Sequence, residues 1–228
     1  MGSDQTNTAH RVVLSKSFYM GIFEVTQKQW TLVTGTDPCS NSSYGKGNSY
    51  PVHYVSYNMI RGATNGANWP SVSDVDATSF LGKLQARTSL SFDLPTGAQW
   101  EYACRAGTTS DYYWGSALIW DYCWYSVNPS TEAHAVGKKR PNAWGLYDMN
   151  GNVWEWCLDW YGSLSYGTDP RGSSSGTERV VTGGSWGTSS DGCTSSSRGS
   201  NDPAVDTHES YRRIGLRLSL TGSSYIAN

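Results

Sequence analysis

The stretch NAWGLYDMNGNVWEWCLDWYG, residues 142–162, places four tryptophans and two tyrosines close together. The whole chain is similarly aromatic: it has 11 Trp and 15 Tyr, although only 37% of its 228 residues are hydrophobic. Aromatic side chains bury large areas, and the N–H of Trp and the O–H of Tyr need hydrogen-bond partners when they are buried. We therefore predict a core that rests on large aromatic residues with polar handles rather than on stripes of Leu and Ile.

Length and charge limit the classes of protein to which the chain can belong. A chain of 228 residues can bury a sizeable core, and because we find no linker or repeat we predict one α+β domain rich in irregular structure. The formal net charge is −2 and only 16% of the residues are charged. We therefore expect no nucleic-acid partner, because a phosphate backbone calls for a basic face. The chain has no run of about 18 apolar residues, so we expect no transmembrane segment.

Both ends of the chain are polar. We expect residues 1–17 to form a flexible lead, residues 18–221 the domain and residues 222–228 a tail. The first eight residues lack the basic and apolar regions of an export signal. This fits either an intracellular start or an exported protein whose leader has been replaced by Met-Gly-Ser. We favour export and a cell-surface tether, because low charge and high Ser, Thr, Gly and aromatic content are typical of such domains.

Few stretches have a helical pattern. Residues 26–33 have Thr26 as an N-cap, residues 73–86 place apolar side chains near one helical face, and Thr96 can cap a helix over residues 97–106. Residues 179–182 and 214–218 have the pattern of late strands that pack against each other.

Two segments are rich in Ser and Gly. We expect residues 163–177 to be an exposed loop. Residues 183–206 have a similar composition, but Trp186 and the last predicted strand bracket them. A disordered tail would not be followed by an apolar strand that returns to the core. We therefore predict that residues 183–206 form an ordered, displayed loop.

Five motifs follow one another along the chain. They are PVHYVSYN (51–58), LPTGAQWEYACRAGT (94–108), the stretch quoted above, VTGGSW (181–186) and RRIGLRL (212–218). Together they resemble the formylglycine-generating-enzyme, or sulfatase-modifying, domain family over almost the whole chain. The resemblance implies a C-type lectin fold of the α+β class, with few short strands, two or three helices and much irregular structure.

The resemblance also shows a departure from the catalytic members of the family. Those members need a pair of reactive cysteines after the GGS motif, where copper binds, and this chain has only Cys193 there. The order GGSW, small polar residues, Cys, Arg, Pro and IGLRL instead resembles the variable region of proteins that retroelements diversify. In those proteins, mutagenesis of adenines in a template copy of the segment yields codons that cannot encode Lys, Gln, Glu, Met or Trp. Between Gly187 and Arg213 only Glu209 belongs to these five residue types, although any Ser/Gly-rich loop would score similarly.

We therefore predict a non-catalytic protein that displays a binding surface on residues 186–213. Fold does not determine function, so two alternatives stay open: an enzyme of the formylglycine-generating or a related oxidase class, and a plain structural module with a solvated loop. We expect a monomer that binds a variable ligand, most simply a protein, over about 800 Å² per side, with His208, Tyr211 and Arg212 as anchors. The expected ligand-binding residues are Gly187, Thr188, Ser189, Asp191, Gly192, Ser197, Gly199, Ser200, Asn201, Asp202, His208, Ser210, Tyr211 and Arg212.

A structural calcium ion is the one cofactor that the resemblance suggests, and none is otherwise required. Residues 148–155 resemble the family's calcium loop, in which side-chain oxygens of Asp148 and Glu155 and carbonyls of Gly151 and Val153 would be the ligands. The alternative is that Glu155 caps or pairs locally. The four histidines show no HxxxH or HExxH spacing, so we expect no zinc or iron site.

The resemblance finally suggests one disulfide. Cys104 and Cys193 match family positions that pair in some members. Such a bond would stabilise the fold by ~2–4 kcal/mol in an oxidising compartment. We expect the other three cysteines to be unpaired and buried.

Overall fold

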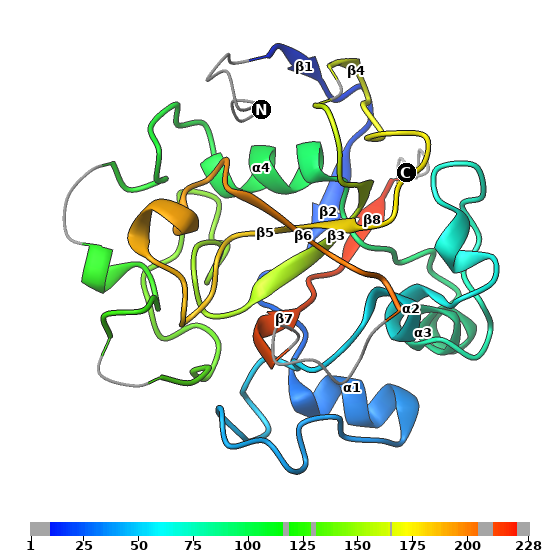
Figure 1. The fold of residues 1–228 in the computed structure, drawn as a ribbon, viewed down its shortest axis with the longest axis horizontal. Helices are drawn as coiled ribbons and strands as arrows, with labels where there is room; N and C mark the ends of the chain where they lie inside the picture. Colours follow the sequence, from blue (N-terminus) through cyan, green and yellow to red (C-terminus); the bar gives the residue numbers. More distant parts are fainter. Residues whose placement is uncertain (1–9, 116–118, 129–130, 165, 205–211, 223–228) are drawn as a thin grey trace, which may run out of the picture.

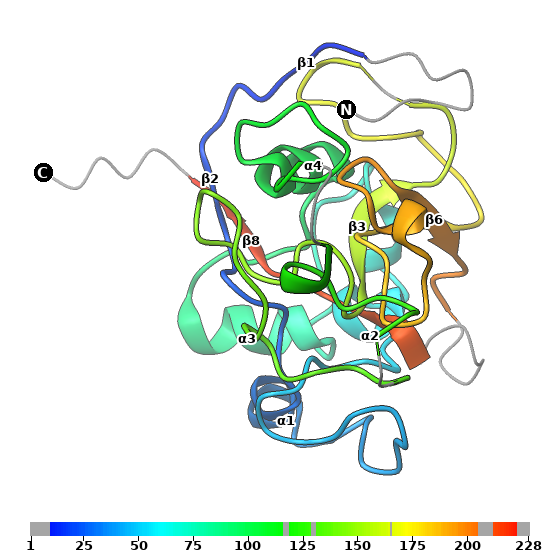
Figure 2. The ribbon, with the colours of Figure 1, turned by 90° about the vertical axis from the view of Figure 1, so that its left-hand side faces the viewer.

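The computed structural model describes residues 10–115, 119–128, 131–164, 166–204 and 212–222, and within them four α-helices surround a central sheet (Figure 1). The helices are α1 (Gln27–Thr34), α2 (Tyr57–Arg61), α3 (Phe80–Thr88) and α4 (Gly97–Arg105), with 3-10 turns η1 (Gly66–Asn68), η2 (Ile119–Asp121) and η3 (Ser190–Cys193). The strands are β1 (Val12–Val13), β2 (Phe18–Met20), β3 (Trp154–Trp160), β4 (Gly167–Thr168), β5 (Arg179–Thr182), β6 (Arg198–Asn201), β7 (Ile214–Gly215) and β8 (Ser219–Thr221). Helix α4 lies on one side of the central strands and α1, α2 and α3 on the other (Figures 1 and 2). The predicted α+β class is confirmed.

Two helices begin at threonines, as predicted. Thr26 caps α1 and Thr96 caps α4, and each hydroxyl accepts a hydrogen bond from the backbone N–H of the glutamine three residues later. The side chains of Gln29 and Gln99 accept in return from the threonine backbone N–H groups. This capping box satisfies donors that the first turn of a helix leaves without partners.

The third predicted helix is shorter than the sequence suggested. We predicted a helix over residues 73–86, whereas Ser79 caps α3 and the preceding residues form a loop. The cause is Asp76, whose carboxylate accepts from the backbone N–H groups of Thr64 and Asn65 at 2.8 and 2.7 Å and so holds its own segment out of the helix. With α2, which we did not anticipate, the described residues contain four helices rather than two or three.

Strand β3 is at the centre of the main sheet, whose strand order is β6-β5-β3-β7. β3 pairs antiparallel with β5 and parallel with β7, and β5 pairs antiparallel with β6. The predicted strands at residues 179–182 and 214–218 are not hydrogen-bonded neighbours, because β3 lies between them. Val181 and Ile214 nevertheless belong to one core cluster.

The side chains of β3 alternate between two buried environments. Trp156 and Leu158 join the core cluster formed with α1, α2 and α3, whereas Cys157 joins the cluster beneath α4. On the α4 side, Glu155 accepts a hydrogen bond of 2.6 Å from Trp100 Nε1. Because successive side chains of a strand point to opposite faces, β3 is covered on both sides, and the core rests on large aromatic residues as predicted.

The N-terminal part of the chain is fastened to later strands. β2 pairs antiparallel with β8, which brings the two ends of the domain together (Figure 2). β1 pairs parallel with β4, and Ser15 N donates to Asp169 Oδ1 at 2.8 Å. In the described residues 10–17 of the predicted flexible lead, β1 and Ser15 thus contact later parts of the chain.

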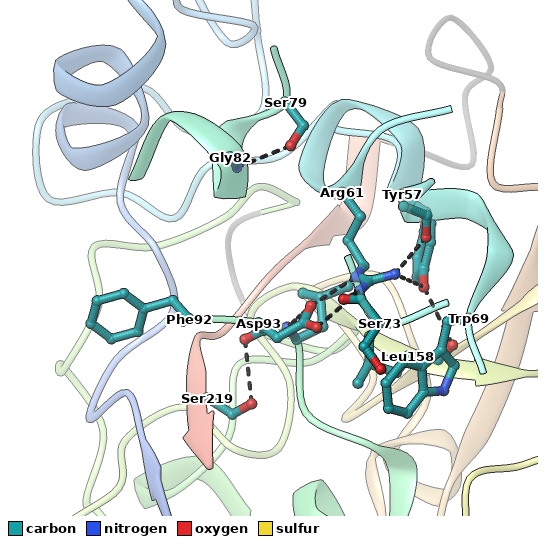
Figure 3. A network of polar contacts seen from close by, with 12 residues as sticks. Tyr57, Arg61, Trp69, Ser73, Ser79, Gly82, Phe92, Asp93, Leu158 and Ser219 are labelled. Atoms are coloured by element: carbon teal, nitrogen blue, oxygen red, sulfur yellow. Dashed lines mark hydrogen bonds and ion pairs between the residues drawn. The ribbon is translucent and has the colours of Figure 1, made fainter. Parts of the chain in front are cut away.

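A buried arginine links α2 to the far strands (Figure 3). Arg61 is fully buried and donates to Asp93 through Nε at 2.7 Å and Nη2 at 2.9 Å. Its Nη1 points at the hydroxyl of Tyr57 at 3.5 Å. Asp93 also exchanges two backbone hydrogen bonds with Ser219 of β8. Burial raises the pKa of Asp93, and the nearby Arg61 opposes that shift. The Arg61–Asp93 ion pair therefore connects α2 to the segment that pairs with β8.

Candidate ligand-binding surface

The predicted binding region begins directly after Trp186. We call residues 187–204 together with 212 and 213 the rim segment, which contains η3 and β6 (Figure 1). His208, Ser210 and Tyr211 lie outside the described residues, so their role as ligand contacts stays a prediction.

Trp186 anchors the start of the rim segment in the core. Its side chain is 2% exposed and packs with Ala133 and Val153. Its ring stacks on Tyr44 with a centroid separation of 6.2 Å, and its backbone N–H donates to Asn152 O at 2.8 Å. The rim segment therefore leaves the core from a fixed point.

The first residues of the rim segment pack closely against their neighbours. Thr188 Oγ1 lies 2.9 Å from Ser185 Oγ and accepts from Ser185 N at 3.1 Å. A Cβ at Gly192 would lie 2.5 Å from Thr188 Cγ2, and one at Gly187 would lie 2.4 Å from Arg213 Cζ. Gly187, Thr188 and Gly192 are thus half-exposed and closely packed by their neighbours, and their contact with a ligand stays a prediction.

The turn η3 presents two exposed polar side chains. Ser189 and Asp191 are exposed, and Ser189 precedes η3 in an extended conformation without a side-chain cap. The backbone beneath them is held by a bond of 2.9 Å from Tyr112 OH to Ser190 O and one of 2.6 Å from Asn150 Nδ2 to Cys193 O. These two positions combine a fixed backbone with free side-chain space.

Strand β6 forms one edge of the main sheet and is half-buried along its length. Gly199 packs over Val181, since a Cβ there would lie 3.1 Å from Val181 Cγ2. Ser200 Oγ donates to Glu178 Oε2 at 2.7 Å, and Asp202, which is exposed, accepts from Ala204 N at 2.8 Å.

Two more predicted residues of this edge are half-buried. Asn201 is the last residue of β6 and pairs with Arg179 of β5. Ser197 precedes the strand, and its carbonyl accepts from Thr182 Oγ1 at 2.9 Å. The backbone of this edge is thereby tied to β5.

Arg212 lies at a different place from β6. It precedes β7, and β6 and β7 are opposite edges of the sheet, about 14 Å apart at ordinary strand spacing. Its Nη1 donates to Tyr44 OH at 2.9 Å and its guanidinium lies 4.6 Å from the centre of that ring. The neighbouring Arg213 Nη1 donates to Gly187 O at 3.3 Å. The structure thus groups Arg212 with the start of the rim segment and not with Ser200 and Asn201.

One predicted calcium ligand, Glu155, is paired with an arginine, which does not fit a calcium site. Both carboxylate oxygens of Glu155 accept from Arg217 Nε at 3.1 Å, and Oε1 also accepts from Nη2 at 2.7 Å. The positive charge of the Arg217 guanidinium, whose Nη2 lies 2.7 Å from Glu155 Oε1, would repel a calcium ion there. Among the described residues no group of three or more His, Cys, Asp or Glu side chains could hold a metal ion.

The same residues form a buried network of charges. Glu24, Asp148 and Glu155 share the interior with Arg217, and all four side chains are at most 2% exposed. Burial raises the pKa of Asp148 to about 6, while a hydrogen bond of 2.6 Å from Gly137 N opposes the shift. Burial also raises the pKa of Glu24 well above its ordinary value, and the two neighbouring carboxylates add to this. The network therefore holds more acids than cations.

The predicted disulfide is absent. All five cysteines are buried, free thiols. Asn150 lies between the two predicted partners: its Oδ1 accepts from Cys104 Sγ at 3.4 Å and its Nδ2 donates to Cys193 O at 2.6 Å. Cys104 therefore belongs to the cluster beneath α4, whereas Cys193 packs with Cys123.

Sequence reasoning missed the residues that support the rim segment from elsewhere. Tyr44, Tyr112 and Glu178 each hydrogen-bond a residue of the segment, from positions 168, 78 and 22 residues away in the chain. Each is a polar or aromatic residue in a loop without periodic pattern, so nothing in the sequence singled it out.

Comparison with known proteins gives a consistent family relationship. The sequence profile of the sulfatase-modifying factor enzyme 1-like domain matches residues 1–220. The Chaperone protein LppX of Paenibacillus barcinonensis is 28% identical over 223 residues, covering 81% of this chain and 74% of that protein. The formylglycine-generating enzyme of Streptomyces coelicolor is 40% identical over 111 residues, which covers 41% of this chain and only 35% of the enzyme.

A solved structure agrees over nearly the full length. Treponema denticola variable protein 1 superposes with a TM-score of 0.76 at 29% sequence identity, covering 95% of this chain and 88% of that one. The predicted fold of formylglycine-generating-enzyme type and the resemblance to a variable protein are confirmed. In the described part of the chain no helix is both long and apolar enough to cross a membrane.

Proposed function

We propose that this chain, which belongs to the sulfatase-modifying factor enzyme 1-like domain family, is a non-catalytic protein that displays a variable ligand-binding surface on its rim segment. One observation carries the proposal: a buried frame supports a polar edge. Trp186 and Asn150 are at most 2% exposed, whereas Ser189 and Asp191 are exposed on backbone that Tyr112 and Asn150 hold. Asp202 is exposed directly after β6.

This division allows side chains to change without loss of fold. Small polar residues on a rigid scaffold supply adaptable hydrogen bonds, and a few aromatic or arginine anchors supply most of the binding energy, as in antibody loops. Arg212 with Tyr44 offers such an anchor. We infer a protein ligand that contacts about 800 Å², and a monomer as the displaying form.

The similarity to Treponema denticola variable protein 1 supports diversification of the rim segment by a retroelement. The test is the DNA around the gene: we expect a reverse transcriptase and an adenine-rich second copy of the segment that encodes Trp186 to Leu218. A neighbourhood with neither would favour a plain structural module. We further propose export and a tether at the cell surface, which protease accessibility on intact cells of the source organism tests.

A display library tests binding directly. Codons for Ser189, Asp191, Asn201 and Asp202 are randomised, and the library is selected against lysozyme as a model protein. A control library randomises Ser163, Ser174 and Ser175, which are exposed but lie outside the rim segment. We expect specific binders from the first library only. Equal yields from both libraries, or none from the first, would contradict the proposal.

The enzymatic alternative rests on the partial match to formylglycine-generating enzymes. Against it, the segment after Trp186 has a single cysteine, Cys193, which is fully buried. Incubation with copper and a cysteine-containing sulfatase peptide separates the two functions. We expect no aldehyde in the peptide, and aldehyde formation would support the enzymatic function instead.

A further inference from the structure

Two cysteines meet at the base of the rim segment. Cys193 ends η3, and Cys123 follows η2 two residues after its end. Both side chains are fully buried and pack together with Tyr125 in one small cluster. No other cysteine belongs to this cluster, so these two thiols are the pair that the packing brings together.

Two glycines make room for this pair. A Cβ at Gly184 would lie 2.4 Å from Cys193 Sγ, and a Cβ at Gly151 would lie 2.6 Å from Cys123 Sγ. The two glycine segments are themselves adjacent, because Gly151 N donates to Gly183 O at 2.7 Å. Side chains at either glycine would push a sulfur out of place, so the backbone is shaped around both thiols.

We propose that Cys123 and Cys193 form a disulfide that fastens η3 of the rim segment to the residues after η2. The two thiols lose two protons and two electrons as the S–S bond forms. A small-molecule disulfide such as oxidised glutathione accepts them and becomes two thiols. This disulfide would lie in the same segment as the proposed binding surface, but it follows only from the packing of the two cysteines in one cluster.

The other cysteines are held away from this pair. Cys104 Sγ donates to Asn150 Oδ1, Cys39 Sγ lies 3.2 Å from the carbonyl of His53, and Cys157 is in the core cluster beneath α4. The pairing that the structure favours is therefore specific, and it differs from the Cys104–Cys193 bond that the sequence suggested.

Burial determines when the bond can form. The attacking species in thiol–disulfide exchange is the thiolate, and burial raises the pKa of Cys123 well above its ordinary value. Exchange in the folded protein is therefore slow, and the bond forms while the chain folds. A bond between residues 123 and 193 closes a long loop, which restricts the unfolded chain. We expect the oxidised protein to melt about 5–15 °C higher than the reduced protein.

Refolding tests the bond on the full chain. Reduced, denatured protein is refolded in a mixture of reduced and oxidised glutathione, then alkylated in denaturant and mapped by mass spectrometry. We expect three alkylated cysteines and one linked peptide pair containing Cys123 and Cys193. Five alkylated cysteines, or a linkage through Cys104, would overturn the proposal.

Matched variants give an independent readout. In Cys104→Ala we expect the same linked pair and the same fall in melting temperature as in the parent when the protein is refolded with dithiothreitol instead of the glutathione mixture. In Cys123→Ala that fall should disappear. If Cys123→Ala does not fold, peptide mapping of the parent still decides. A fall that persists in a folded Cys123→Ala protein would show that another pair carries the bond.

Discussion

Replacing Arg217 with methionine should destabilise the protein more than any change on the rim segment. Arg217 is fully buried and donates to Glu155 at 2.7 Å, and also to the carbonyls of Gly21 and Tyr147 at 2.9 and 2.8 Å. Methionine fills much of the same volume but supplies no donor. Glu155, which is 1% exposed, then remains buried without its counter-ion.

The expected loss follows from the cost of an unpaired buried charge. Breaking a buried ion pair by removing one partner costs about 3–5 kcal/mol. For a domain of this size each kcal/mol lowers the melting temperature by about 2–4 °C, so we expect a fall of roughly 6–20 °C. Glu24 and Asp148 lose the same cation, which places the loss toward the upper end.

Urea unfolding followed by tryptophan fluorescence measures this loss. The matched control is the double variant Arg217→Met with Glu155→Gln, which removes both charges and should recover part of the stability, since the two residues are in direct contact. A loss below about 1 kcal/mol in Arg217→Met, or a double variant worse than the sum of the two single variants, would refute the role of this pair.

Three further changes test other parts of the account. Asp148→Asn should stabilise the protein at pH 7 and not at pH 4. Burial raises the pKa of Asp148 to about 6, so the wild type loses up to about 3 kcal/mol of stability as pH rises through that pKa. Equal melting temperatures of variant and wild type at pH 7 would contradict this. Gly184→Ala should lower the free energy of unfolding by more than about 2 kcal/mol, because Gly184 has φ 78° and Cys193 Cα lies 3.0 Å from the added Cβ. Gly187→Ala should lower it by less than about 1 kcal/mol, because the side chain of Arg213 can move. Similar losses in the two variants would contradict this difference in packing. Adding about 1 mM calcium should leave the melting temperature unchanged, while a rise of about 5 °C would restore the calcium site.

Local signals explain which elements could be predicted from the sequence. Thr26 and Thr96 each precede a glutamine by three residues, and this capping pattern is contained within one helical turn. The start of α3 could not be predicted because Asp76 bonds to Thr64 and Asn65, which lie in another loop. The residues around Asp76 are the same whether its carboxylate favours the first turn of a helix or accepts hydrogen bonds from a distant loop, so the sequence alone does not separate the two cases.

The candidate site shows the same limit. The position of the rim segment after Trp186 follows from the order of motifs along the chain. The role of Glu155 does not, because its partner Arg217 is 62 residues away. A carboxylate in an Asn/Gly-rich loop resembles a calcium ligand until that arginine is placed beside it. The separation of Arg212 from Ser200 could not be predicted either, because it depends on the strand order. That order places β5 and β3 between β6, which contains Ser200, and β7, which follows Arg212.

The central claim is that the rim tolerates change because the frame beneath it does not depend on those side chains. A single protein carrying Ser189→Tyr, Asp191→Tyr and Asp202→Asn tests this most directly, with its melting temperature measured beside that of Arg217→Met. At roughly 0.5 kcal/mol or less for each surface change, we predict a total shift of at most about 3–6 °C and retained cooperative unfolding. A shift as large as that of Arg217→Met, or loss of the cooperative transition, would contradict the claim.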